Sequence, residues 1–176
     1  MIDLKRLNEL PQSEFVAVLG GIFEHSPWVA ERTAAHRPFA SRAQLIDTMR
    51  AVVQAAAVEE QLALIRAHPR LGARGRALTT LTTASQGEQR RAGLDACSDE
   101  EYARLLSLND AYFARFSFPF ILAVRGHDPQ SIIKSCVQRL NSEPAAEHEA
   151  ALEQIGLIAG YRLADAIEAD AAGDAR

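Results

Sequence analysis

Apolar residues recur along most of this chain at the three- and four-residue spacing of amphipathic helices. Leu4, Leu7 and Leu10, for example, share one helical face. Val, Ile and Thr do not gather in alternating runs, and the abundant alanine favours helix, so no strand is predicted. The pattern predicts about eight helices, near residues 4–10, 13–19, 28–35 and 41–68, and then from Ser85, from Ser98, from Asp128-Pro129 and from Ser142-Glu143-Pro144 onward.

The longest of these predicted helices is capped by Ser41 and keeps an apolar face up to His68, where Pro69 must end it. The helical pattern then fails between Arg70 and Thr83, a stretch that contains two glycines, three arginines and four threonines. We expect an irregular loop there. Loops carry binding and catalytic residues more often than helix interiors do.

Two segments match the Ser-x-x-Glu capping box, one at Ser85–Glu88 and one at Ser98–Glu101. In the first, Glu88 would reach back to the amide of Ser85. A helix that starts at Ser85 would also present free backbone amides, which can bind an anionic or carbonyl group of a ligand.

Composition narrows the class of protein. The 176 residues are 48% hydrophobic and 24% charged, which fits one compact all-α domain over residues 1–176. With 19 Lys and Arg against 23 Asp and Glu, the net charge is −4, so no basic stripe for nucleic acid is expected. No apolar stretch approaches the roughly 20 residues of a membrane span. The N-terminus lacks the apolar core of a secretory signal, and Cys97 and Cys136 are isolated, so we expect a cytoplasmic protein without a membrane partner.

No phosphate loop, dinucleotide fingerprint or His-Glu-x-x-His helix is present in the sequence, so no cofactor or metal site is predicted. The candidates for chemistry are polar residues beside irregular backbone, namely His68, Glu88 and Arg162. Each has a structural alternative. His68 could cap the end of a helix, Glu88 could only close its capping box, and Arg162 could be solvated or paired internally.

Several separate segments, in order, resemble the family of 2-oxo-4-hydroxy-4-carboxy-5-ureidoimidazoline (OHCU) decarboxylases of the uric acid pathway. The resemblance covers most of the chain. One position departs from it: Ser117 stands where the family pattern has Gly between two aromatics, and Ser would strain the turn if φ is positive there. The matching segments are Gly21–Trp28, Ala67–Gly72, Ser85–Gln89, Ala92–Leu94, Leu108-Asn109 with Tyr112, Arg115–Ile121, and Arg162.

The resemblance implies cofactor-independent decarboxylation of this ureidoimidazoline to (S)-allantoin, in purine catabolism. By the same resemblance, His68 is the catalytic acid/base and Glu88 is its partner. Arg162 would hold a carbonyl or carboxylate oxygen, and Phe118 and Phe120 would supply an apolar wall. The other residues that the family places around the substrate are Pro69, Ser85, Gln86, Gly87, Gln89, Phe120, Ile121, Leu122, Ala123 and Val124.

Two other functions remain open on the sequence. One is a helical interaction module without catalysis, in which residues 113–120 form a docking surface. The other is a metal hydrolase that uses His25, His36 and His68, although no two of these histidines have the i, i+4 spacing. The partner expected from the decarboxylase hypothesis is a small molecule, and the assembly to be tested is a homodimer.

Overall fold

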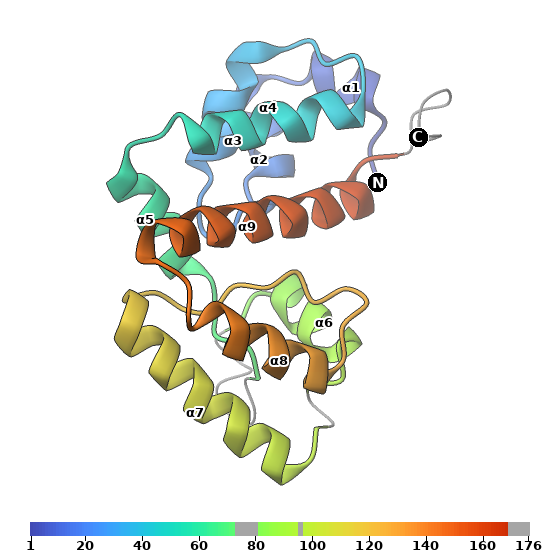
Figure 1. Ribbon diagram of the computed structural model, residues 1–176. Helices are drawn as coiled ribbons and strands as arrows, with labels where there is room; N and C mark the ends of the chain where they lie inside the picture. The colour runs from blue at the N-terminus through green and yellow to red at the C-terminus, as the bar shows by residue number, and fades with distance from the viewer. Residues whose placement is uncertain (73–80, 95–96, 169–176) are drawn as a thin grey trace. The chain divides into compact units, whose positions relative to one another are not determined.

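The computed structural model describes residues 1–72, 81–94 and 97–168. Within these ranges the chain is all-α, as predicted, and its β-pairing is limited to an isolated parallel bridge between Ile2 and Ile167. The α-helices are α1 (Leu4–Glu9), α2 (Gln12–Leu19), α3 (Trp28–Thr33), α4 (Arg42–Gln54), α5 (Val58–Ala67), α6 (Thr83–Arg91), α7 (Asp99–Phe116), α8 (Pro129–Arg139) and α9 (Pro144–Ala166), with a 3-10 turn at Ala34–His36 (Figure 1).

The chain forms two compact units. The first contains α1 to α5 and the part of α9 from Gly156 onward, and the second contains residues 68–155. In the first unit, α2 and α4 both pack on α3. The Arg50 guanidinium of α4 donates to the backbone oxygen of Gly156 in α9 at 2.9 Å. The prediction of a single domain over residues 1–176 stays a prediction.

The second unit is built around the pair α7 and α8, which pack side by side (Figure 1). Both helices begin where local capping chemistry predicts. Ser98 and Glu101 form a capping box at the start of α7, and Asp128 and Ser131 form one at the start of α8. Tyr112 of α7, which is fully buried, stands at the centre of an aromatic cluster in this unit.

The prediction of one long helix from Ser41 to His68 is wrong, because the helix is interrupted at residues 55–57, between α4 and α5. All three residues there are alanine, the best helix former, so propensity gives no sign of the break. Side chains from the next turn stabilise it. Gln61 Nε2 donates to the backbone oxygens of Val53 and Gln54, and a Glu60 carboxylate oxygen accepts from the Ala57 amide.

Helix α7 ends at a residue in the left-handed region. Ser117 has φ 62° and ψ 23°, and its amide donates to the Phe113 oxygen. The condition for strain at this position, a positive φ, is therefore met, and the family's Gly would adopt this conformation without the steric cost that Ser incurs.

Replacing Ser117 with Gly is expected to raise the free energy of unfolding by about 1 kcal/mol, because Gly removes the contact between Cβ and backbone that penalises this conformation. Urea unfolding measures the change. Ser135→Gly is the matched control, since Ser135 lies inside α8 and Gly should destabilise that helix. A Ser117→Gly variant that loses stability as the control does would contradict the strain assignment.

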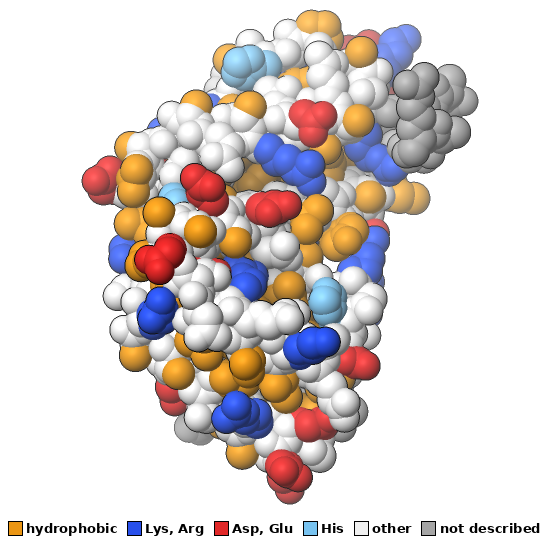
Figure 2. Space-filling model, in the orientation of Figure 1, with side chains coloured by type: hydrophobic (Ala, Val, Ile, Leu, Met, Phe, Trp, Pro, Cys, Tyr) orange, Lys and Arg blue, Asp and Glu red, His pale blue; other side chains and the backbone are white. Residues whose placement is uncertain are grey.

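No helix among the described residues is long and apolar enough to cross a membrane. On the face shown in Figure 2, acidic and basic side chains are interspersed rather than gathered by sign. This distribution agrees with the small net charge of −4.

Candidate active site

His68 opens the second unit, directly after the last residue of α5. Its side chain is buried, with 7% of its surface exposed. Pro69 follows and is half-buried, and Pro at this point prevents the helix from continuing. The structure thus places the imidazole in a low-dielectric environment at the end of α5. That a helix ends at this point is as the sequence predicts.

The three residues after His68-Pro69 are held by side chains from two helices. Gln89 of α6 accepts from the Gly72 amide at 2.9 Å and donates to the Arg70 oxygen at 3.1 Å. Asn109 of α7 donates to the Leu71 oxygen at 2.9 Å. We call His68–Gly72 the His68 segment. Of the predicted loop over residues 70–83, residues 73–80 lie outside the described residues.

Helix α6 begins earlier than the capping-box pattern predicts. Its N-cap is Thr82, whose side chain accepts from the Ser85 amide at 3.3 Å, and the Gln86 amide donates to the Thr82 oxygen at 2.9 Å. The predicted box at Ser85–Glu88 and the free amides of Ser85 and Gln86 are therefore wrong. Glu88 lies inside α6, beyond its first turn, so it does not close a capping box at the start of the helix, as the structural alternative for Glu88 required.

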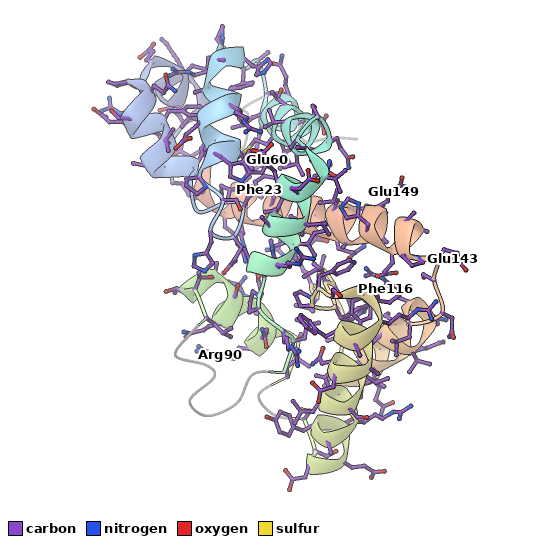
Figure 3. The ribbon with its side chains drawn as sticks, turned by 90° about the vertical axis from the view of Figure 1, so that its left-hand side faces the viewer. Phe23, Glu60, Arg90, Phe116, Glu143 and Glu149 are labelled. Atoms are coloured by element: carbon purple, nitrogen blue, oxygen red, sulfur yellow. The ribbon has the colours of Figure 1, made fainter. Side chains whose placement is uncertain are left out.

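The other sequence-predicted residues of α6 differ in what surrounds them. Ser85 is buried, and its Oγ accepts from the Thr82 hydroxyl. The side-chain Nε2 of Gln86 donates to the backbone oxygen of Leu81 at 3.2 Å. A Cβ built on Gly87 would meet no heavy atom within 4 Å, so the helix leaves open space at this position. Figure 3 locates α6 by its exposed residue Arg90.

Residues 118–124 run as an irregular, buried strip between α7 and α8 in the sequence. The rings of Phe118 and Phe120 both pack against Tyr112, with centroids 6.0 and 5.2 Å away. These two rings therefore belong to the core cluster, and the expectation that they form an apolar wall for a ligand has no support in these contacts. Phe116, labelled in Figure 3, ends α7 and stacks on Phe118.

A buried polar network fixes the backbone of this strip. Arg139 donates to the Ile121 oxygen at 2.6 Å and to Glu147 at 2.8 Å, and the Tyr112 hydroxyl also donates to Glu147. Burial, reinforced by the bond to Glu147, raises the pKa of Tyr112, so the phenol stays protonated as a donor. The Ala123 amide donates to Gln154 at 3.0 Å. These hydrogen bonds hold the backbone of residues 120–124 in place at Ile121 and Ala123.

Arg162 lies in the first unit, within the last turns of α9. It is buried, and its guanidinium donates to a Glu24 carboxylate oxygen at 2.6 Å. Glu24, next to the Phe23 labelled in Figure 3, is 2% exposed and comes from the loop before α3. The alternative that Arg162 is paired internally is confirmed for this contact. Such a pair holds the planar guanidinium in one orientation.

Sequence reasoning gave no role to Glu24, Asn109, Arg139 or Glu147. The available signals were an acidic residue directly after the apolar pair Ile22-Phe23, as at Glu24, and the position of Asn109 within a motif that already matched. Among the described residues, no three or more His, Cys, Asp or Glu side chains come together as a metal site would need. For the hypothesis of a hydrolase site built on His25, His36 and His68, the described residues therefore supply no cluster of metal-ligating side chains.

Several known proteins are similar in sequence to this chain. The 2-oxo-4-hydroxy-4-carboxy-5-ureidoimidazoline decarboxylase of Haloferax volcanii is 41% identical over 164 residues, which cover 93% of this chain and 95% of that protein. The uric acid degradation bifunctional protein PucL of Bacillus subtilis is 45% identical over 167 residues, 95% of this chain. This chain spans about a third of the length of PucL and of the bifunctional protein from Bacillus sp..

Two solved structures are similar as well. A crystal structure of (S)-allantoin synthase superposes with a TM-score of 0.76 at 32% identity, over 96% of this chain and 54% of that one. A crystal structure of OHCU decarboxylase in the presence of (S)-allantoin, with a TM-score of 0.68 and 22% identity over 86% of this chain and 95% of that one, shares the fold. The sequence model of the family described as OHCU decarboxylase matches residues 8–164, which include His68, Glu88 and Arg162, and this chain belongs to that family.

Proposed function

We propose that this protein decarboxylates 2-oxo-4-hydroxy-4-carboxy-5-ureidoimidazoline to (S)-allantoin in uric acid degradation, without a cofactor. The observation that carries the proposal is the family match over residues 8–164, which runs through both units of the chain. The same match supports one decarboxylase domain over residues 1–176. A nearly full-length relative with this named activity, 41% identical, supports the substrate.

The substrate supplies its own electron sink. Its carboxylate and hydroxyl share a ring carbon that adjoins a carbon doubly bonded to nitrogen. When the bond to the carboxylate breaks, its electron pair forms a double bond to the neighbouring carbon, and the imine pair moves to nitrogen, which takes a proton. The hydroxyl then loses its proton to become the carbonyl, and the neighbouring carbon takes a proton on one face. The enzyme must orient the carboxylate and move these protons.

The imidazole of His68 suits the proton transfers, because its two ring nitrogens can donate and accept a proton. Glu88 is its proposed partner, which orders the imidazole or the ureido group. Pro69, Ser85, Gln86, Gly87 and the backbone of residues 120–124 surround the substrate. Arg162, held by Glu24, binds a substrate oxygen, an assignment that rests on its place in the family motif.

A rate measurement on the purified protein tests this function. The substrate, made fresh by opening the ring of 5-hydroxyisourate, decays spontaneously, so carbon dioxide release is compared with and without protein, and again after exhaustive dialysis against a chelator. We expect clear acceleration that survives the chelator. Release at the spontaneous rate would favour the interaction module, and activity restored only by a divalent metal would favour the metal hydrolase.

Glu88→Gln is expected to leave the thermal midpoint close to wild type and to lower turnover on the order of 10²-fold, since Gln keeps the shape but cannot exchange a proton as a carboxyl group does. Because Thr82 caps α6, no capping role of Glu88 complicates the comparison. Glu101→Gln is a control, as Glu101 closes the box of α7 and its change should spare turnover. Normal turnover in Glu88→Gln would remove Glu88 from the mechanism.

Gly87→Ala is expected to stabilise the protein by up to about 1 kcal/mol, because Ala has the higher helix propensity and its Cβ would meet open space. If the substrate occupies that space, the added methyl raises KM at the same time. Thermal unfolding and steady-state kinetics on the same preparation measure both. A stabilised variant with unchanged KM would take Gly87 out of the substrate site.

A cytoplasmic location and a homodimer stay predictions. Cys97 and Cys136 are both buried and neither takes part in a disulfide, which supports a reducing compartment. Burial raises the pKa of the Cys136 thiol to about 11, so it stays protonated and unreactive. Size-exclusion chromatography with light scattering measures the oligomeric state directly.

A further inference from the structure

Two buried amide side chains hold the backbone of the His68 segment. Gln89 is 5% exposed and Asn109 is 2% exposed, and together they bond the Arg70 oxygen, the Leu71 oxygen and the Gly72 amide. Three successive residues of an irregular segment are thus bonded by side chains from two different helices. A buried backbone group without a partner costs about 1–3 kcal/mol, so these bonds strongly favour one path for the segment.

Steric contacts act in the same direction. Gly72 has φ +79°, and a Cβ placed on it would lie 2.6 Å from Leu105 of α7, so the segment approaches that helix as closely as only Gly permits. At the surface, the Arg70 side chain pairs with Asp110 at 2.7 Å and lies over the Phe113 ring. Contacts from α6 and α7 therefore fix the chain immediately after His68-Pro69.

We propose that Gln89 and Asn109 are positioning residues, which set the imidazole of His68 by fixing the backbone that follows it. This inference rests on the proposed function in that His68 is the acid/base. Gln89 uses both ends of its amide on the segment: its oxygen accepts from Gly72 and its nitrogen donates to Arg70.

A second observation on Asn109 supports its role as a positioning residue. Its nitrogen is bonded to Leu71, while its Oδ1 is buried without a hydrogen-bond partner. An unpaired buried acceptor costs stability. The cost is accounted for if the bond from Nδ2 to the segment matters to function, because an apolar residue at this position would avoid it.

The test compares Gln89→Met and Asn109→Leu with Asn8→Leu. Asn8 clasps the backbone of Phe39 with two hydrogen bonds of 2.9 and 2.8 Å, and it belongs to the first unit. Asn8 is a matched control, because its side-chain amide also holds a backbone segment, but no proposed catalytic residue adjoins that segment. Each variant is measured for thermal midpoint, for kcat and KM, and for the NMR resonances of the His68 imidazole.

We expect kcat to fall about tenfold or more in Gln89→Met and Asn109→Leu with little change in KM, because a displaced acid/base slows chemistry without removing a binding contact. The His68 resonances should shift in both variants. Asn8→Leu should lower the thermal midpoint and leave kcat and the His68 resonances unchanged. Gln89→Glu, which keeps the acceptor for Gly72 but loses the donor to Arg70, should give an intermediate kcat and remains informative if Gln89→Met folds poorly.

A raised KM with unchanged kcat in Gln89→Met would overturn the inference and make Gln89 a substrate ligand. Unchanged His68 resonances in both site variants would overturn it whatever the activity. A different measurement tests the proposed function, which would be contradicted if the wild-type protein did not accelerate carbon dioxide release. The two failures are therefore distinguished by separate measurements.

Discussion

Replacing His68 with Asn is expected to lower the acceleration of allantoin formation on the order of 10²-fold or more, while the helical fold remains. Asn is similar in size and polar, so it can occupy the buried position, but it does not titrate near neutral pH. Steady-state kinetics give the loss, and far-ultraviolet circular dichroism reports the fold.

His36→Asn is the matched control. His36 is exposed in the 3-10 turn of the first unit, so its loss should change neither turnover nor fold. If a well-folded His68→Asn variant turned over like wild type, His68 would only be the residue that ends α5, and the acid/base assignment would be wrong.

The buried pair of Glu24 and Arg162 has the largest expected effect on stability. Glu24→Gln leaves the Arg162 charge buried without its counter-charge, and such losses cost roughly 3–5 kcal/mol. Glu60→Gln is the control, because Glu60, labelled on α5 in Figure 3, forms an exposed pair with Arg32 that water screens. Urea unfolding of both variants measures the contrast. Equal small shifts in the two would contradict the buried pair.

A double variant separates the structural role of this pair from binding. Apolar residues of similar volume can replace a buried ion pair at little cost, so Glu24→Leu combined with Arg162→Met should recover much of the stability. Allantoin formation should not recover, because the guanidinium that we propose as the ligand of a substrate oxygen is missing. A double variant that is both stable and fully active would make Arg162 a structural residue only.

Helix positions were predictable where their signals are local. The capping box at Ser98–Glu101 and the helix cap at Asp128 bond within three residues, and α7 and α8 begin there as the sequence predicts. The start of α6 was not, because Thr82, Thr83 and Ser85 all carry a capping hydroxyl and the sequence does not rank them. The break after α4 depends on the Gln61 side chain, which overrides the preference of alanine for helix.

The candidate site shows the same division. Motifs located His68, Glu88 and Arg162, whose positions could be read one residue at a time. The side chains that hold Arg162 and the His68 segment come from far along the chain. Glu24 lies 138 residues from Arg162, and Asn109 lies 38 residues from Leu71 of the His68 segment. No periodicity links residues at such separations, so only the folded chain shows these pairs.

The handedness of the product tests the central claim most directly. Spontaneous decay has no chiral catalyst to select a face, whereas a buried acid/base delivers the proton to one face of the neighbouring carbon. Circular dichroism of the allantoin formed with wild-type protein, read before the product racemises, should show the (S) enantiomer in excess, and the same reaction with His68→Asn should show a racemic product. Racemic allantoin from the wild-type protein would contradict the account.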